Sequence, residues 1–195
     1  GNHSHSHDYL TKFTFQKFVE DIEESIKIFE NKLGYNPIFF SYPFGEYNLE
    51  QKNYISNNFE FAFGQHSGVI DLNKDRYELP RFPINEKYGE IKRFKEVISY
   101  LPLQYKIIKP ENKFMNDGEN PPKMTIEFFE DQKNLENINC FSNEGSKWRK
   151  TKIILNDNIL NINFSEKFIE RRGRINCSLK DENGWRFSGF QFVQN

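Results

Sequence analysis

Residues 38–45 read Ile38-Phe39-Phe40-Ser41-Tyr42-Pro43-Phe44-Gly45. The three apolar residues at the start are too few for a helix and are typical of a short strand buried on both faces. Polar and turn-forming residues follow at once, which places a loop at the carboxyl end of that strand. Ligand sites in parallel α/β sheets gather at these strand ends. The stretch therefore predicts an α/β fold with a candidate site in the loop.

Helical periodicity surrounds this stretch on both sides. Upstream, apolar residues three and four apart form one stripe from Phe15 to Leu33, which predicts an amphipathic helix. Thr14 is the expected N-cap and Gly34 the expected C-terminal stop. Strands that alternate with helices indicate βα units around a parallel sheet. The further elements expected downstream are a weak helix at 49–57, a strand at 59–63 and a helix at about 91–101.

The pattern changes after residue 109. Residues 110–123 contain three prolines and a glycine, a composition typical of a linker. Beyond them, apolar residues alternate with polar ones, as in Ile175-Asn176-Cys177-Ser178-Leu179, which predicts antiparallel strands. We therefore predict two domains, an α/β domain at 1–109 and a small antiparallel β-sandwich at 124–195. Ser188-Gly189 in the last strand is the expected position of a β-bulge.

Composition excludes several classes of function. The net charge of −1 creates no strong field that would attract nucleic acid or an anionic membrane. No apolar run is long enough for a transmembrane segment. The two cysteines, Cys140 and Cys177, are open to two interpretations: buried free thiols, or one disulfide formed in an oxidising compartment.

The amino-terminal residues contain a candidate metal site. His3 and His7 are four residues apart, and on a helical turn this spacing places both imidazoles on one side. Neutral imidazoles are good ligands for zinc and similar divalent ions. Taken alone, the motif is also compatible with an expression-tag remnant or with a solvated terminus.

Together, these motifs resemble the NodB-like polysaccharide deacetylases, carbohydrate esterase family four. His3-Ser4-x-x-His7, with the lead-in Gly1-Asn2, matches the second motif of that family, and Pro43-Phe44-Gly45 matches the third. The resemblance covers about residues 1–105 and argues against the tag interpretation. It implies a partial, distorted (β/α) barrel, a zinc or other divalent ion, and hydrolytic deacetylation of an N-acetylglucosamine-containing polysaccharide. It also implies a periplasmic, envelope-associated or secreted location.

The resemblance assigns roles to individual residues. His3 and His7 are the expected metal ligands, and the backbone N–H of Phe44 is the expected donor to the oxyanion. Tyr42, Pro43 and Phe44 are expected to form a wall that faces the sugar.

Two further residues are candidates for substrate contact. Arg81, in the extended segment Leu79–Asn85, is expected either to hold a catalytic carboxylate or to touch substrate, and a structural ion pair is the alternative. His66 follows a strand and is expected to reach the groove, with an unassigned loop histidine as the alternative.

The chain also departs from the family pattern. The family's Asp-Asp pair, which supplies a metal ligand and the general base, belongs upstream of the histidine motif, and Asp8 is poorly placed to replace it. We therefore expect residues 1–195 alone to be inactive. The rival interpretations are a noncatalytic carbohydrate-binding relative and a cell-surface interaction protein. For these rivals, Trp148 and Trp185 are candidate exposed aromatic residues that stack on a sugar, and packing in the core of the sandwich is the alternative and more frequent use of tryptophan.

Overall fold

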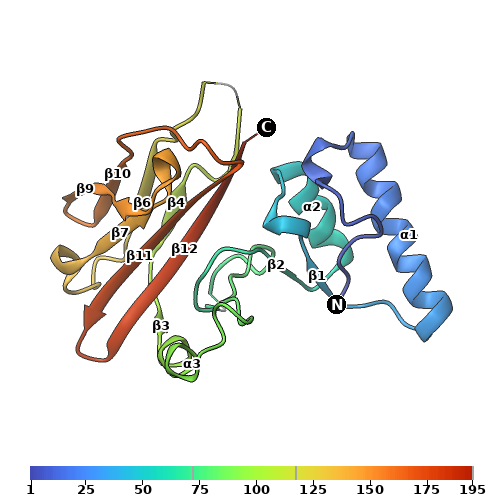
Figure 1. Cartoon of the computed structure of the whole chain (residues 1–195), viewed down its shortest axis with the longest axis horizontal. Coiled ribbons are helices and arrows are strands. Elements are labelled where there is room, and N and C mark those ends of the chain that lie inside the picture. The colour runs from blue at the N-terminus through green and yellow to red at the C-terminus, as the bar shows by residue number, and fades with distance from the viewer. Residues whose placement is uncertain (72, 117, 195) are drawn as a thin grey trace. The chain divides into compact units, whose positions relative to one another are not determined.

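The computed structural model describes residues 1–71, 73–116 and 118–194. The chain divides into two units (Figure 1). The first unit consists of Gly1–Gln65 and Ile70–Arg81, and the second of His66–Val69 and Phe82–Asn195. The structure mixes helices with strands, and most strand pairs are antiparallel. No helix in the described part of the chain is long and apolar enough to cross a membrane.

Helices and strands alternate in the first unit, as the sequence predicts. Helix α1 begins after Thr14, whose side chain accepts a hydrogen bond from the Lys17 N–H. It ends at Gly34, whose φ of 74° is the left-handed conformation that glycine adopts without strain. The elements in chain order are η1 (Leu10–Lys12), α1 (Phe15–Leu33), β1 (Phe39–Ser41), η2 (Pro43–Gly45), α2 (Leu49–Asn58) and β2 (Phe61–Phe63).

Strands β1 and β2 pair in parallel and are flanked by two more segments. Asn2 forms a parallel bridge with Phe40, and Leu79 forms one with Phe63. Residue 2, β1, β2 and residue 79 therefore lie side by side and run in the same direction. Among the described residues this sheet remains open, so the predicted barrel stays a prediction.

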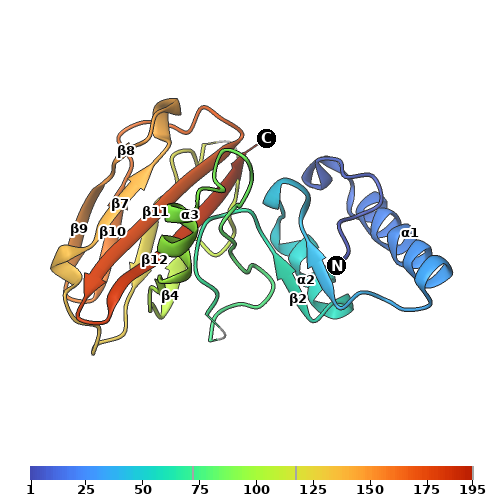
Figure 2. The same cartoon turned by 60° about the horizontal axis from the view of Figure 1, so that its bottom comes forward.

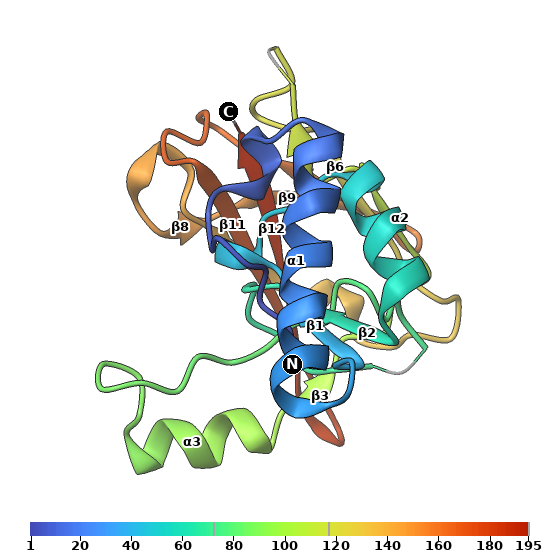
Figure 3. The ribbon, with the colours of Figure 1, turned by 90° about the vertical axis from the view of Figure 1, so that its right-hand side faces the viewer.

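Helices α1 and α2 lie next to each other and cover one face of this sheet (Figure 3). Their apolar faces share one core with the inward-pointing strand residues Phe40 and Ala62, both of which are 0% exposed. The fully buried side chains that α1 and α2 add are Phe18, Ile22 and Ile55. This packing fixes the carboxyl ends of the strands, where the candidate site lies.

The second unit contains two β-sheets, with the long antiparallel pair β11–β12 in one of them (Figure 2). The first sheet has the order β4-β6-β10-β9. The second has the order β3-β12-β11-β7-β8, with β5 also paired to β12. The elements are α3 (Ile91–Ile98), β3 (Leu101–Pro102), β4 (Ile107–Lys109), β5 (Phe114–Met115), β6 (Met124–Glu127), η3 (Leu135–Asn137), β7 (Asn139–Ser142), η4 (Glu144–Ser146), β8 (Arg149–Lys150), β9 (Lys152–Asn156), β10 (Ile159–Asn163), β11 (Arg172–Asp181) and β12 (Gly184–Gln194).

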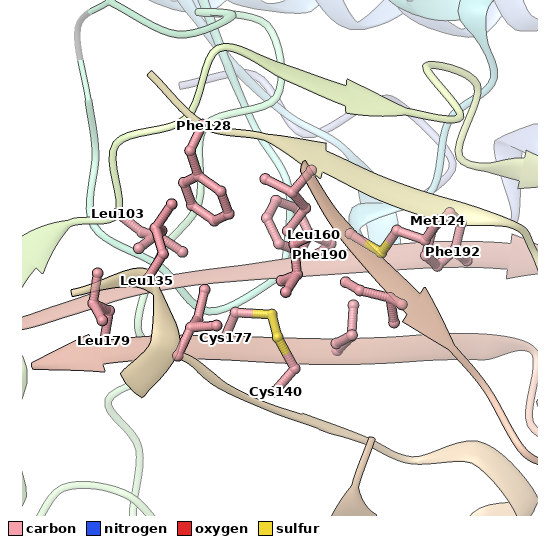
Figure 4. Packing of buried hydrophobic residues seen from close by; sticks show 14 of the residues in the cluster. Leu103, Met124, Phe128, Leu135, Cys140, Leu160, Cys177, Leu179, Phe190 and Phe192 are labelled. Atoms are coloured by element: carbon pink, nitrogen blue, oxygen red, sulfur yellow. A yellow bond between two sulfur atoms is a disulfide. The ribbon is translucent and has the colours of Figure 1, made fainter. Parts of the chain in front are cut away.

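One hydrophobic core lies between the two sheets (Figure 4). Ile126 and Leu160 contribute from one sheet, and Ile175 and Phe192 from the other. Cys140 on β7 and Cys177 on β11 are direct cross-strand partners and form a disulfide with a Cα–Cα distance of 4.1 Å. Of the two interpretations of the cysteines, the structure contains the disulfide.

The boundary between the units does not lie in the linker expected at residues 110–123. It falls at residues 81 and 82, and the proline-rich segment belongs to the second unit. The segment pairs despite its composition: β5 lies beside β12, and the Val193 N–H donates to the Lys113 carbonyl at 2.8 Å. The prolines occupy positions outside these contacts, so they do not prevent the pairing.

The prediction of a β-bulge at Ser188-Gly189 is wrong. The β11–β12 register runs residue for residue through this point, with Cys177 opposite Ser188 and Asn176 opposite Gly189. The glycine has another reason to be there. A Cβ on Gly189 would collide with the carbonyl oxygen of Ser67, because the 66–69 segment crosses the strand and Gly68 bridges Ser188.

Candidate metal and substrate site

A cavity of about 180 Å³ lies at the carboxyl ends of the parallel segments of the first unit. Each segment contributes the residues that follow it. His3 follows the bridge at Asn2, and Ser41 and Tyr42 end and follow β1. Gly64 and Gln65 follow β2, and Arg81 follows Leu79. Four parallel segments thus converge on one cavity, which is the position where parallel sheets place their ligand sites.

Asn2 anchors the residue that precedes His3. Its N–H donates to the Phe39 carbonyl at 2.7 Å, and its own carbonyl accepts from the Ser41 N–H at 2.9 Å. Its side chain is 0% exposed and donates to the Ser25 hydroxyl of α1 at 2.7 Å. Because backbone and side chain are both held, the histidine loop leaves the sheet edge in a fixed direction.

The two imidazoles lie together, but no helical turn brings them there. Ser4 and His7 have positive φ values of 63° and 55°, so the segment is a tight loop. The Ser4 hydroxyl accepts a hydrogen bond from the His7 N–H at 3.0 Å, which closes the loop. The ring centroids of His3 and His7 are 4.7 Å apart. The predicted pairing of the rings is therefore present, while the predicted helical geometry is wrong.

The tautomer of His3 is set by its partner. Its Nδ1 lies 2.7 Å from the Ser41 carbonyl oxygen, and a carbonyl only accepts, so Nδ1 carries the proton in this contact. The lone pair of the neutral ring is then on Nε2. Histidines that bind metals are held in this way, with the other ring nitrogen donating to a carbonyl or carboxylate. His3 therefore presents one nitrogen suited to a metal ion.

The ring of Phe44 contacts the ring of His7. Its ring centroid is 5.0 Å from that of His7 and 4.3 Å from the stacked ring of Tyr9. Its φ of 59° and ψ of 5° place its backbone in the left-handed region, a conformation that non-glycine residues adopt at a cost and that is frequent at functional sites. The next residue, Gly45, has a φ of 68°, and a Cβ there would lie 2.7 Å from the Cβ of Gln65. Only glycine fits the turn at this point.

Of the three residues expected to form a sugar-facing wall, Tyr42 alone is among the residues that line the cavity. Tyr42 contributes to the cavity lining, yet its residue is 1% exposed and its ring packs on Phe40 and Tyr47. Pro43 is buried as well. The rings of Tyr42 and Pro43 are therefore closed to sugar stacking, and Phe44, which is half-buried and stacked on Tyr9, is not among the residues that line the cavity. Tyr42 belongs to the core of the first unit together with Phe40 and Tyr47, and this packing buries its ring.

A partly buried cluster of charged and polar side chains lies near Tyr42, which lines the cavity. Lys52 of α2 makes ion pairs with Asp75 at 2.7 Å and Glu78 at 3.3 Å, and the Tyr47 hydroxyl donates to Glu78 at 2.8 Å. Burial, followed by the charges of Asp75 and Glu78, raises the pKa of Tyr42 well above its usual value. Tyr42 therefore stays neutral. The cluster ties the segment before Leu79 to α2, and that connection positions the residues that lead into Arg81.

Arg81 and His66 have different positions. Arg81 lines the cavity with an exposed side chain, and the ion pairs among the described residues do not include it. The structural ion pair considered for Arg81 is therefore not seen in this part of the chain. His66 belongs to the second unit and is not among the residues that line the cavity.

The sequence patterns did not identify Asp21 as a site residue. From α1, one carboxylate oxygen of Asp21 accepts the His5 N–H at 2.9 Å and the other accepts the Ser6 N–H at 3.0 Å. These two N–H groups belong to the loop between the histidines, so a single side chain holds the turn that brings the rings together. Asp21 directly precedes the buried Ile22 on the helix, and nothing local distinguishes it from the acidic residues around it.

Replacing Asp21 by asparagine is expected to lower the zinc affinity of the chain by roughly 10-fold or more, as the loss of outer partners of a metal site does. Asparagine keeps one acceptor and turns an amide N–H₂ toward the second backbone N–H. The measurement is isothermal titration of zinc into residues 1–195. Glu24→Gln, the same kind of charge removal at an exposed position of α1, is the control. Equal affinities for the two variants would contradict the role of Asp21.

The site contains some, but not all, of the protein ligands that a catalytic metal ion requires. Two imidazoles face one another, and one of them has a fixed tautomer. Within the described residues, however, no group of three histidine, cysteine, aspartate or glutamate side chains is arranged to hold a metal ion. Catalytic zinc sites use three protein ligands and leave a position for water. The described residues therefore fit two of the three positions.

Comparison with known proteins agrees with this geometry. Residues 1–61 match the family model of the polysaccharide deacetylases. The matched range contains the histidine loop, β1 and the Pro43-Phe44-Gly45 turn. No curated protein and no solved structure gives a significant match to the chain. The amino-terminal part of this chain, residues 1–61, is therefore similar to part of a polysaccharide deacetylase domain.

Proposed function

We propose that the protein to which this chain belongs removes acetyl groups by hydrolysis from an N-acetylglucosamine-containing polysaccharide, with zinc or another divalent ion bound at His3 and His7. The observation that carries the proposal is the meeting of these two rings with Phe44 beside a cavity at the carboxyl ends of four parallel segments. The family match of residues 1–61 supports the reaction class.

The residues of this chain have distinct parts in that reaction. Nε2 of His3 and the ring of His7 would hold the ion. A bound ion would polarise the acetyl carbonyl and lower the pKa of a bound water to about 7. The Ser41 carbonyl holds the His3 ring in the tautomer that this needs. The Phe44 N–H, in its left-handed turn, is the proposed donor to the oxyanion. Arg81 is proposed to orient a carboxylate or the substrate at the cavity rim.

The general base and the third ligand are proposed to come from an Asp-Asp pair that precedes Gly1 in the parent protein. Two considerations support this. The described residues contain no third ligand at the cavity, and positioned proton transfer is typically worth about 10²–10⁴-fold in rate. A chain without the base is therefore expected to be inactive even when zinc is present.

The cross-strand disulfide supports a proposed location. Disulfides persist in the periplasm, on cell surfaces and in secreted proteins, and are rare in reducing compartments. The bond between Cys140 and Cys177 favours a periplasmic, envelope-associated or secreted protein.

The test is a paired assay of acetate release from an N-acetylglucosamine oligosaccharide with added zinc. One sample is residues 1–195, and the other is a form extended upstream to include the residues that precede Gly1. Release by the extended form only, stopped by a chelator and restored by zinc, is the expected result. Comparable release by residues 1–195 would place the carboxylates within this chain and refute the proposed assignment.

A second candidate function is a noncatalytic carbohydrate-binding relative. It is favoured by the two-ligand composition of the site among the described residues. The same assay separates the two, because this candidate requires that the extended form bind the oligosaccharide without releasing acetate.

A further inference from the structure

A polar cleft of about 370 Å³ lies in the second unit and is lined by none of the residues of the histidine site. One wall is the turn between β11 and β12, and the other is the loop that follows β6. Both walls belong to the same unit, so the cleft is formed by one body. Neither Trp148 nor Trp185 lines it, although they are 53% and 47% exposed.

A partly buried ion pair fixes the turn wall. Asp181 accepts the N–H groups of Asn183 at 2.8 Å and Gly184 at 3.1 Å, and it pairs with the Nε of Arg186. The hydrogen bond from Arg186 lowers the pKa of Asp181, which is therefore ionised. Arg186 also donates to the Pro102 carbonyl at 3.1 Å. These contacts hold the wall rigid before any ligand arrives, so little ordering is needed on binding.

The loop wall presents an exposed ring. Phe128 is 0% exposed and lies in the core, and its N–H and carbonyl are both held by Asn158 at 2.8 and 2.9 Å. Phe129 follows it and is turned outward, with 42% of the residue exposed, beside the cleft. The Gln132 N–H donates to the Phe129 carbonyl at 3.1 Å and closes the loop. The apolar ring of Phe129 therefore lies at the edge of a polar surface, on a loop whose backbone is held by hydrogen bonds.

The lining indicates the chemistry of the ligand. Since Asp181 and Arg186 neutralise each other, the remaining charges at the cleft are Asp131, Glu182 and Lys133, which have both signs. A phosphate would need a basic surface. A divalent metal ion would need several converging oxygen ligands, and the described residues contain no group of three acidic, histidine or cysteine side chains that could hold one. The side-chain amides at the cleft are those of Gln104, Gln132, Asn134 and Asn183. Amides donate and accept hydrogen bonds in pairs, as vicinal hydroxyl groups and acetamido groups require.

We propose that this cleft binds a neutral segment of the polysaccharide, with a sugar ring stacked on Phe129 and its hydroxyl and acetamido groups bonded to the amides. The choice of an N-acetylglucosamine chain as the ligand rests on the proposed function. The cleft itself shares no residue with the histidine site, so the second unit would hold substrate independently of the metal.

The test measures binding of an N-acetylglucosamine hexasaccharide to residues 1–195 by calorimetry, in the presence of EDTA. EDTA removes any contribution from metal at His3 and His7. Phe129→Ala is expected to weaken binding roughly fivefold or more, the ratio that corresponds to loss of one aromatic contact. Asn183→Ala is the second variant, because its turn contact is made by backbone and is retained. Phe141→Ala, a ring of similar exposure on β7 outside the cleft, is the control.

Weaker binding by both cleft variants and unchanged binding by the control would support the proposal. Binding that is unaffected by Phe129→Ala, or no binding of the hexasaccharide, would overturn it. A preference for inorganic phosphate over the hexasaccharide would also overturn it. Because the chelator is present throughout, these outcomes do not depend on deacetylation, and loss of acetate release by the extended form would leave them unchanged.

Discussion

Alanine at His3 or His7 is expected to reduce zinc-dependent acetate release by the extended form by more than roughly 100-fold. Loss of an outer partner of a metal ligand already costs about 10–100-fold, and loss of the ligand itself should exceed that range. The two rings are 4.7 Å apart and one is fixed by the Ser41 carbonyl, so each variant leaves a single imidazole. Acetate release and zinc titration are the two measurements.

His5→Ala is the matched control for these variants. His5 lies between the two histidines, and the contact that holds it runs from its backbone N–H to Asp21. Its removal is therefore expected to leave zinc affinity and acetate release within about twofold of the unaltered protein. If His7→Ala retained zinc affinity while His5→Ala lost it, the pairing of His3 with His7 would be wrong.

Reduction of the Cys140–Cys177 disulfide is expected to lower the free energy of unfolding of the second unit by about 4 kcal/mol. The two cysteines are 37 residues apart, and the chain entropy released by opening a loop of this length corresponds to about that value. The measurement is denaturant unfolding with and without a reductant, followed by the fluorescence of Trp148 and Trp185, which both lie in the second unit.

The first unit provides the control for this experiment. The chain has only two cysteines and both are in the second unit, so the reductant is expected to leave the unfolding of the first unit unchanged. That transition can be followed by circular dichroism at helical wavelengths, because α1 and α2 belong to the first unit. An unfolding midpoint of the second unit that did not move on reduction would contradict the expected stabilisation.

Local patterns predicted the parts of the fold that depend on neighbouring residues. The bounds of α1 follow from one apolar stripe, an N-cap at Thr14 and a left-handed stop at Gly34, all of which act within a turn or two. The loop after β1 was predictable for the same reason, because Pro43 and Gly45 act on their own backbone. The spacing of His3 and His7 predicted that their rings would meet, but a tight loop held by Asp21, and not a helical turn, brings them together.

Contacts between distant segments were not predictable in this way. Tyr42 is buried because Tyr47 and the Asp75–Glu78 region close over it, and Asp21 has a role because α1 passes beside the histidine loop. Gly189 marks the crossing of Ser67 instead of a bulge. Each of these depends on a partner at least five residues away, and most on one much further along the chain, where sequence spacing gives no signal.

Each wall of the cavity is formed by residues at the end of a different strand segment. This arrangement allows one wall to change in sequence while the others stay the same. His3, Ser41, Gly64 and Arg81 each follow a separate segment of the same sheet. Loops at such positions tolerate insertions, because the sheet beneath them is held by its own pairing and core. Exchange of one loop could therefore alter which acetylated sugar is accepted while the histidine loop is left intact. Directed evolution of substrate preference is best confined to these loops, with Asn2, Asp21 and Gly45 kept constant.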